Sequence, residues 1–259
     1  MTVKPFNATF FMLLAIGAIL FITIRAVFKN QSVKSKKIFL VIMSAANIAL
    51  YFTYKACLSV DAEFVAISGI SKFNWFNELP LQLCNINLFL IPIGALIGSR
   101  AIMGFSFFTA PLGAVMALIF PEPAFTGFSL ATPRIFGFYV THILIMVAGL
   151  TLTSLGFYRP QFRDFPCVVV AFLALSFSVH IINLILRATV CPFANYFFTF
   201  GADVSILKLF WRFIPVPYLF ELPSIAILLA YMFVVTSAMN AADRLKARRA
   251  AVSASSENV

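Results

Sequence analysis

The stretch LPLQLCNINLFLIP, residues 79–92, places polar and reactive side chains at the start of an apolar segment. Gln82, Cys84, Asn85 and Asn87 fall within six consecutive positions. A thiol is nucleophilic as the thiolate, and a neighbouring imidazole can remove its proton and later protonate a leaving group. The chemistry open to Cys84 therefore depends on which histidine lies beside it.

Polar side chains from three other segments fall at a similar depth to Cys84. With helices that rise about 1.5 Å per residue, Cys84 lies about 9 Å, His142 about 12 Å and His180 about 10 Å from one membrane surface. Ionisable residues inside spans are rare and usually functional. The resulting polar layer contains Cys84, His142, His180, Asn183 and Glu221.

Three kinds of site are compatible with this layer. In the first, Cys84 is the nucleophile of an acyl-transfer site, His142 or His180 is the base, and Asn183 or Glu221 orients it. In the second, Cys84, His142 and His180 bind zinc and leave a fourth position for water, as in a hydrolase. In the third, the layer binds a solute in a transporter or binding protein. Plain hydrogen bonding between helices is the structural alternative.

The composition is that of a membrane protein. Hydrophobic residues make up 62% of the 259 residues and charged residues only 11%, with a mean hydropathy of +0.99. A soluble domain could not cover so much apolar surface. We predict an all-α, polytopic domain over residues 1–240. Its seven transmembrane helices are expected near residues 8–28, 38–58, 79–98, 101–120, 135–157, 166–186 and 214–238.

The positive charges predict the orientation of these helices. Of the 19 Lys and Arg residues, twelve fall on one side of the predicted membrane, six on the other, and Lys55 lies within a span. The positive-inside rule then places the N-terminus outside and the C-terminus in the cytoplasm. The net charge of +10 is thus a topology signal and an expected contact with anionic lipid, not a sign of nucleic acid binding.

Helical phase predicts that the helix carrying Cys84 is central. At about 100° per residue, Gln82 and Asn85 share a stripe with Glu78, while Asn87 points to the opposite side. Polar groups on more than one face require protein on more than one side, because lipid cannot satisfy them.

The segments outside the spans carry weaker signals. Residues 121–133 contain three prolines and are predicted to form a structured cap. Residues 203–213 have the pattern of an interfacial helix, and a loop that only covers the bundle is the alternative. Residues 241–259 form a predicted cytoplasmic tail, basic and then polar, with disorder from Val252. Of the four cysteines, Cys57 and Cys191 lie near the outer surface, where a disulfide is permitted but not implied.

Four segments resemble the YwaF-like family of multi-pass membrane proteins, which is related to animal transmembrane cysteine-dependent phospholipid acyltransferases. They are LPLQLCNINLFLIPIGAL at 79–96, RIFGFYVTHILIM at 134–146, NYFF at 195–198 and IPVPYLFELPSIAILL at 214–229. Cys84 matches the family's cysteine, His142 its histidine in the fifth span, and Glu221 its acidic residue in the last span. Asn195 and Tyr196 match its Asn-Tyr pair, whereas Gln82 stands where many relatives have histidine.

The resemblance implies a membrane-embedded acyltransferase or lipid-modifying enzyme. Cys84 and His142 are the expected catalytic residues, with supporting or substrate-binding roles for Gln82, Asn85, His180, Asn183, Asn195, Tyr196 and Glu221. The expected partner is a membrane phospholipid or another acyl donor, with no cofactor. A bacterial plasma membrane is the expected location.

Overall fold

The computed structural model describes residues 1–201 and 205–256, and it is built from long apolar helices. Six of them are long and apolar enough to cross a membrane. They are α1 (Ala8–Phe28), α2 (Val33–Leu58), α5 (Arg100–Ile119), α6 (Pro133–Ser154), α7 (Phe165–Thr189) and α9 (Ser224–Ser256). A helical, multi-pass membrane protein is therefore confirmed. A seventh apolar helix, α4 (Leu83–Ile97), is shorter.

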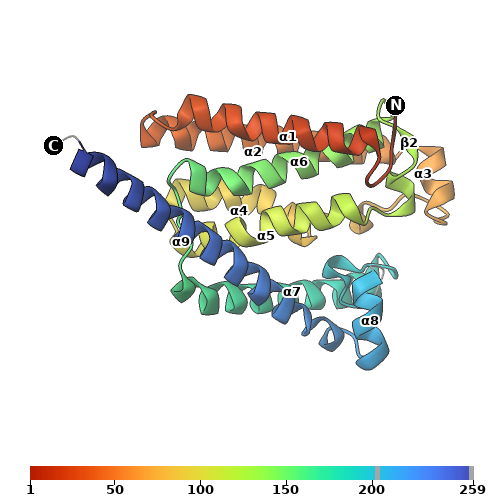
Figure 1. Ribbon diagram of the computed structural model, residues 1–259. Helices are drawn as coiled ribbons and strands as arrows, with labels where there is room; N and C mark the ends of the chain where they lie inside the picture. The colour runs from red at the N-terminus through yellow and green to blue at the C-terminus, as the bar shows by residue number, and fades with distance from the viewer. Residues whose placement is uncertain (202–204, 257–259) are drawn as a thin grey trace.

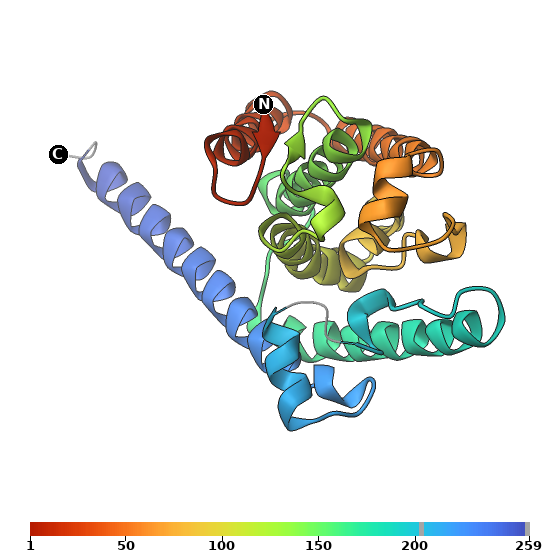
Figure 2. The same cartoon turned by 90° about the vertical axis from the view of Figure 1, so that its right-hand side faces the viewer.

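The helices form a bundle with two helices lying to one side of it. Helices α1, α2, α4, α5 and α6 run side by side, and α6 packs against each of the other four. Figure 2 looks along this bundle and shows α7 and α9 running obliquely beside it. Helix α7 contacts α5, and α9 contacts α7. The polar start of α4 is consequently enclosed by α2, α5 and α6, as the helical phase predicts.

Helix α4 is short because the chain before it is not helical. A 3-10 turn, η1 (Trp75–Asn77), and a bent, non-helical stretch through Pro80 precede Gln82, which occupies the N-cap position of α4. The helix ends at Gly98, which adopts the left-handed φ of 70° that glycine tolerates best. Fifteen residues span about 22 Å, less than the roughly 30 Å hydrocarbon core, so the predicted helical span 79–98 is too long.

Two glycines allow the helices around α4 to approach closely. A Cβ atom at Gly137 of α6 would collide with the Tyr54 side chain of α2. At Gly113 of α5, a Cβ atom would lie 3.3 Å from the backbone nitrogen of Cys84. The close contact of α5 with the first turn of α4 is therefore possible because Gly113 has no side chain.

A cap covers the end of the bundle that holds the N-terminus (Figure 1). It contains α3 (Ala62–Ile67), the 3-10 turn η2 (Pro123–Phe125), and two short strands. The strands, β1 (Thr2–Val3) and β2 (Phe128–Ser129), pair antiparallel with Thr2 opposite Ser129. The structured cap predicted for residues 121–133 is present, and the strands add a small β element to a fold predicted to be all-α.

Arg134, at the start of α6, joins the cap to the bundle. Its guanidinium donates hydrogen bonds to Asp61 and Glu63 of the α3 region, each at 2.6 Å, and to the Ala124 carbonyl at 3.0 Å. Its carbon Cζ lies 4.4 Å from the centre of the Phe128 ring. Arg134 is only 1% exposed, so these two carboxylates provide the compensation that a buried cation near a helix N-terminus needs.

Acid should weaken the cap by protonating Asp61. Burial raises the pKa of Asp61, but the hydrogen bond from the Phe64 N–H and the Arg134 guanidinium outweigh it and hold the pKa below its usual value. A depressed carboxyl pKa contributes stability that is complete above the unfolded pKa of about 4 and is lost as the pH falls through the folded pKa. We expect the difference in unfolding free energy between wild type and Asp61→Asn to shrink below about pH 4. A pH series of thermal unfolding in detergent measures this difference, and a difference that stays constant from pH 6 to pH 3 would contradict the role of Asp61.

The C-terminal third differs most from the predicted spans. Helix α8 (Ser205–Phe213) confirms the helix predicted there, of which residues 203 and 204 lie outside the described chain. The segment after it contains Pro215, Pro217 and Pro223 and forms only the 3-10 turn η5 (Leu219–Glu221). Because proline cannot continue a helix, α9 begins at Ser224 rather than at 214. It then runs through most of the predicted tail, so disorder from Val252 is wrong as far as Ser256, and residues 257–259 lie outside the described chain.

Candidate active site

Cys84 and His142 lie side by side at the cap end of the bundle. The Cys84 sulfur is 3.5 Å from Nε2 of His142, within the range of a thiol–imidazole hydrogen bond. Cys84 is the second residue of α4, and His142 lies in the buried face of α6. Their exposed fractions are 7% and 3%. Two residues 58 positions apart in the chain therefore form a close, buried pair.

The hydrogen bonds of His142 define which nitrogen can act as a base. Nδ1 lies 2.7 Å from the carbonyl oxygen of Phe138, one helical turn earlier. A carbonyl oxygen only accepts hydrogen bonds, so this contact assigns the proton of the neutral ring to Nδ1. Nε2 then presents its lone pair to the thiol. The Phe138 ring, 4.4 Å from the imidazole between ring centres, packs against it and limits its rotation.

Cys84 lies in the first turn of α4, at the positive end of the helix dipole. The first backbone N–H groups of a helix, here those of Cys84 and Asn85 among them, have no partner within it. Together with the positive end of the helix dipole, such groups stabilise a thiolate. The Asn85 side-chain oxygen lies 3.6 Å from the sulfur and can accept its proton in a hydrogen bond.

Lys55 is a further member of this site that the sequence reasoning did not assign to it. It is 7% exposed and forms an ion pair with Glu78. The rings of Tyr51, Tyr54 and Phe125 surround its ammonium group, with centres 5.0–5.7 Å away. Phe125 in turn stacks on Phe138, which packs against the His142 ring and so links the surroundings of Lys55 to the pair. A lone lysine inside a predicted span is the sequence signal that identifies such a residue.

Four of the other predicted site residues hold a loop in place. Asn183 donates hydrogen bonds to the Tyr196 carbonyl and to Thr199, and it accepts one from the Tyr196 N–H. The Tyr196 hydroxyl accepts from the Leu79 N–H at 2.7 Å. These bonds anchor the 3-10 turn η4 (Tyr196–Phe198) between α7 and the segment before α4.

Gln82 and Asn195 complete this anchoring. The Gln82 side-chain oxygen accepts a hydrogen bond from the Phe197 N–H at 2.9 Å, directly before the helix that carries Cys84. Asn195 bonds within its own loop, to the Gly201 carbonyl and the Phe200 N–H. Gln82, Asn183, Asn195 and Tyr196 thus support the segment that leads into Cys84.

His180 and Glu221 lie in a different environment from the Cys84–His142 pair. The His180 ring stacks on Phe200 with ring centres 4.8 Å apart and also packs against Tyr218. Glu221 is buried in η5, and its Oε1 has no hydrogen-bond partner in the described chain. The group that orients His142 is the Phe138 carbonyl, and within the described chain neither Asn183 nor Glu221 forms a hydrogen bond with His142.

The positions of the side chains also bear on the remaining cysteines and on the zinc alternative. All four cysteines, each within the described residues, are free thiols, and the Cys191 sulfur contacts Asn77 at 3.8 Å. Among the described residues, no three His, Cys, Asp or Glu side chains are placed to hold a metal ion. Because His180 packs in the α7 layer, Cys84 and His142 contribute only two ligands.

The fold and this site define a multi-pass helical membrane protein with a buried cysteine–histidine pair. The model of the TMEM164 family matches residues 3–237, so the chain belongs to this family. The family relation expected from the four sequence segments is thereby confirmed. No curated protein and no solved structure shows significant similarity to the chain.

Proposed function

We propose that the protein is a phospholipid acyltransferase in which Cys84 carries the acyl group. The observation that carries the proposal is the 3.5 Å contact between the Cys84 sulfur and Nε2 of His142, with Nδ1 bonded to the Phe138 carbonyl. Membership of the TMEM164 family supports the same class of reaction. A nucleophile, its base and the group that orients the base are thus all present.

The first half of the reaction forms a thioester. Nε2 of His142 accepts the Cys84 proton, and the thiolate attacks the ester carbonyl of a phospholipid. The tetrahedral intermediate collapses by breaking the bond between the carbonyl carbon and the glycerol oxygen. His142 then returns its proton to this oxygen, which leaves a lysophospholipid and S-acylated Cys84.

The second half regenerates the thiol. His142 accepts the hydroxyl proton of a lysophospholipid acceptor, whose oxygen attacks the thioester carbonyl. The carbon–sulfur bond breaks, and the Cys84 sulfur takes the proton back from His142. One ester is consumed and one is made, so the exchange needs no external energy source and no cofactor.

Lys55 and the start of α4 would stabilise the negative charge that appears in both halves. The charge on the tetrahedral oxygen would lie close to the sulfur, at the first turn of α4, where the backbone N–H groups have no partner within the helix. Fixed donors and charges in a site without water are effective in this role, because they do not have to reorganise during the reaction. The ion pair with Glu78 and the surrounding rings hold Lys55 in position.

Replacing Lys55 should separate its electrostatic role from its structural one. We expect Lys55→Met to lower the acyl-transfer rate about tenfold and to lower stability, because Glu78 loses its partner. Adding Glu78→Gln should restore the melting temperature but not the rate. Rates and melting temperatures of wild type, Lys55→Met and the double variant measure this. If the double variant recovers both quantities, Lys55 has only a structural role.

The orientation in the membrane is part of the proposal. The excess of positive charge at the end of the bundle opposite Cys84 supports a cytoplasmic location for that end. The cap, Cys84 and His142 would then face the outer leaflet, with α4 as a seventh membrane-embedded segment. We propose the bacterial plasma membrane as the location, and the cytoplasmic accessibility of a C-terminal tag tests the orientation.

The function is tested by following one labelled acyl chain. Purified protein is placed in vesicles that contain a diacyl phospholipid with one deuterated chain and an unlabelled lysophospholipid acceptor. We expect deuterium to appear in the acceptor without added coenzyme A or metal. Label released only as free fatty acid would replace the proposal with hydrolysis, and label that remains in the donor would refute it.

A further inference from the structure

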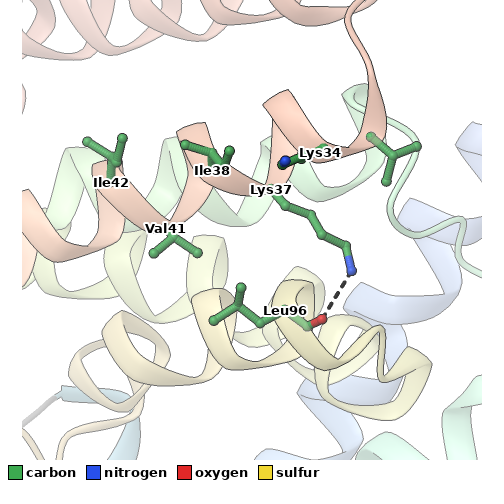
Figure 3. A pocket seen from close by; sticks show the side chains of 7 residues that line it. Lys34, Lys37, Ile38, Val41, Ile42 and Leu96 are labelled. Carbon is green, nitrogen blue, oxygen red and sulfur yellow. Dashed lines mark hydrogen bonds between the residues drawn. The ribbon is translucent and has the colours of Figure 1, made fainter.

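A groove lies at the end of the bundle opposite Cys84, between the start of α2 and the end of α4. Figure 3 shows its lining, with Lys34, Lys37, Ile38, Val41 and Ile42 on α2 facing Leu96 on α4. Its volume is about 470 Å³. Cys84 and Leu96 are twelve residues apart on α4, which corresponds to about 18 Å. The groove is therefore separate from the candidate active site.

The walls of the groove are aliphatic and its end is basic. Ile38, Ile42 and Leu96 are exposed in the protein by itself, so the groove opens toward the surrounding lipid. Lys37 extends across the groove and donates a hydrogen bond to the Leu96 carbonyl at 3.0 Å. The charge of Lys37 is thus held at the end of α4, where the carbonyl groups of a helix favour a cation.

Along α2, charged and apolar side chains follow one another in the same order as the headgroup and the acyl chain of a phospholipid. Lys34, Ile38 and Ile42 follow one another at intervals of four residues and therefore lie on one face of the helix. The distance from Lys34 to Ile42 along the helix is about 12 Å. A phosphate beside the lysines would place the first carbons of its acyl chain between Ile38 and Leu96.

We propose that this groove binds one anionic phospholipid, with its phosphate at Lys34 and Lys37 and one acyl chain between α2 and α4. An apolar groove alone would accept the chain of any lipid. The two ammonium groups favour a headgroup with net negative charge over a zwitterionic one, because the latter brings its own cation. The Lys34 side chain makes no hydrogen bond within the described chain and is free to bind phosphate.

Such a lipid would join the two helices that carry Lys55 and Cys84. The site is distinct from the proposed acyl-transfer reaction, because it needs neither Cys84 nor His142. It lies at the end where the positive charges of the predicted cytoplasmic side gather, and the inner leaflet supplies anionic phospholipid there. The bound lipid would therefore stabilise the α2–α4 contact without being a substrate.

Native mass spectrometry of the purified protein with phosphatidylglycerol and phosphatidylcholine tests the site. We expect wild type to retain phosphatidylglycerol preferentially, and Lys34→Ala with Lys37→Ala to weaken this binding about 30-fold. Arg244→Ala with Lys246→Ala removes the same charge from an exposed part of α9 and is the matched control. Val41→Trp keeps both lysines, fills the groove, and should also weaken binding.

Three results would overturn the proposal. The first is equal retention of the two lipids by wild type. The second is an equal loss of binding in the two charge-removal variants, which would indicate unspecific attraction of anionic lipid. The third is full competition by the soluble headgroup glycerophosphoglycerol together with unchanged binding in Val41→Trp, which would show that no acyl chain enters the groove.

Discussion

Cys84→Ala is expected to lower the rate of acyl transfer by at least about a thousandfold and to leave the fold intact. The substitution removes the atom that forms the thioester, and no other nucleophile lies against Nε2 of His142 in the described chain. His142→Ala should lower the rate by about a hundredfold to ten-thousandfold, the usual contribution of a positioned base. Initial rates of deuterated-acyl transfer in vesicles measure both effects.

Cys167→Ala is the matched control for Cys84→Ala. Cys167 is an exposed thiol at the start of α7 and makes no contact with the pair. This variant should keep the wild-type rate, and all three variants should melt within a few degrees of wild type. A Cys84→Ala protein that transfers acyl chains at the rate of Cys167→Ala would show that Cys84 is not the nucleophile.

Arg134→Met is expected to lower the free energy of unfolding by about 3 kcal/mol. The substitution removes the cation that pairs with Asp61 and Glu63 and the donor to the Ala124 carbonyl. Removing one member of a buried ion pair costs about 3–5 kcal/mol. The lower end of this energy range applies to Arg134 because water can reach Glu63, whose side chain is 58% exposed. Thermal or denaturant unfolding in detergent micelles measures the change.

Arg100→Met provides the comparison for Arg134→Met. Arg100 also forms a two-point contact with a carboxylate, that of Asp164, but its side chain is 43% exposed. Exposed ion pairs contribute at most about 1 kcal/mol. The loss of unfolding free energy in Arg134→Lys should lie between the losses in Arg134→Met and Arg100→Met, because lysine keeps the charge but lacks the planar guanidinium. Equal effects of Arg134→Met and Arg100→Met would contradict the role of Arg134 in holding the cap.

The helical membrane fold could be predicted from the sequence because lipid imposes a simple requirement on composition. Long apolar runs must satisfy their own backbone hydrogen bonds, and helices do so within one segment. Hydropathy does not fix where such helices begin. Pro80 delays α4, and Pro215, Pro217 and Pro223 delay α9. The helix that follows Pro223 continues into residues whose polarity suggested a tail.

Only part of the candidate site could be predicted, because position along a helix gives depth but not direction. Position along the helices predicts one depth for Cys84, His142, His180 and Glu221, and the structure brings Cys84 and His142 together. His180 and Glu221 share that depth in the sequence argument but belong to the α7 and η5 region at the side of the bundle. Depth alone could not distinguish these two arrangements.

Long-range contacts account for the residues whose roles differ from the prediction. The sequence predicts that Gln82 is a supporting polar group near Cys84, but its hydrogen-bond partner is a backbone N–H 115 residues later in the chain. In the sequence, Lys55 is an isolated charge in a predicted span, and only the folded chain shows its ion pair and the aromatic rings around its ammonium group. Neither partner is close enough in sequence for spacing to reveal it.

The central claim is that Cys84 becomes acylated, and mass spectrometry of the protein after incubation with deuterated phospholipid tests it most directly. We predict that wild type gains the mass of one deuterated acyl chain in the peptide that contains Cys84, and that neutral hydroxylamine removes it as expected for a thioester. His142→Ala should gain it much more slowly, and Cys84→Ala not at all. Transfer of label to the acceptor with no acyl adduct on Cys84, even after rapid quenching, would contradict the account.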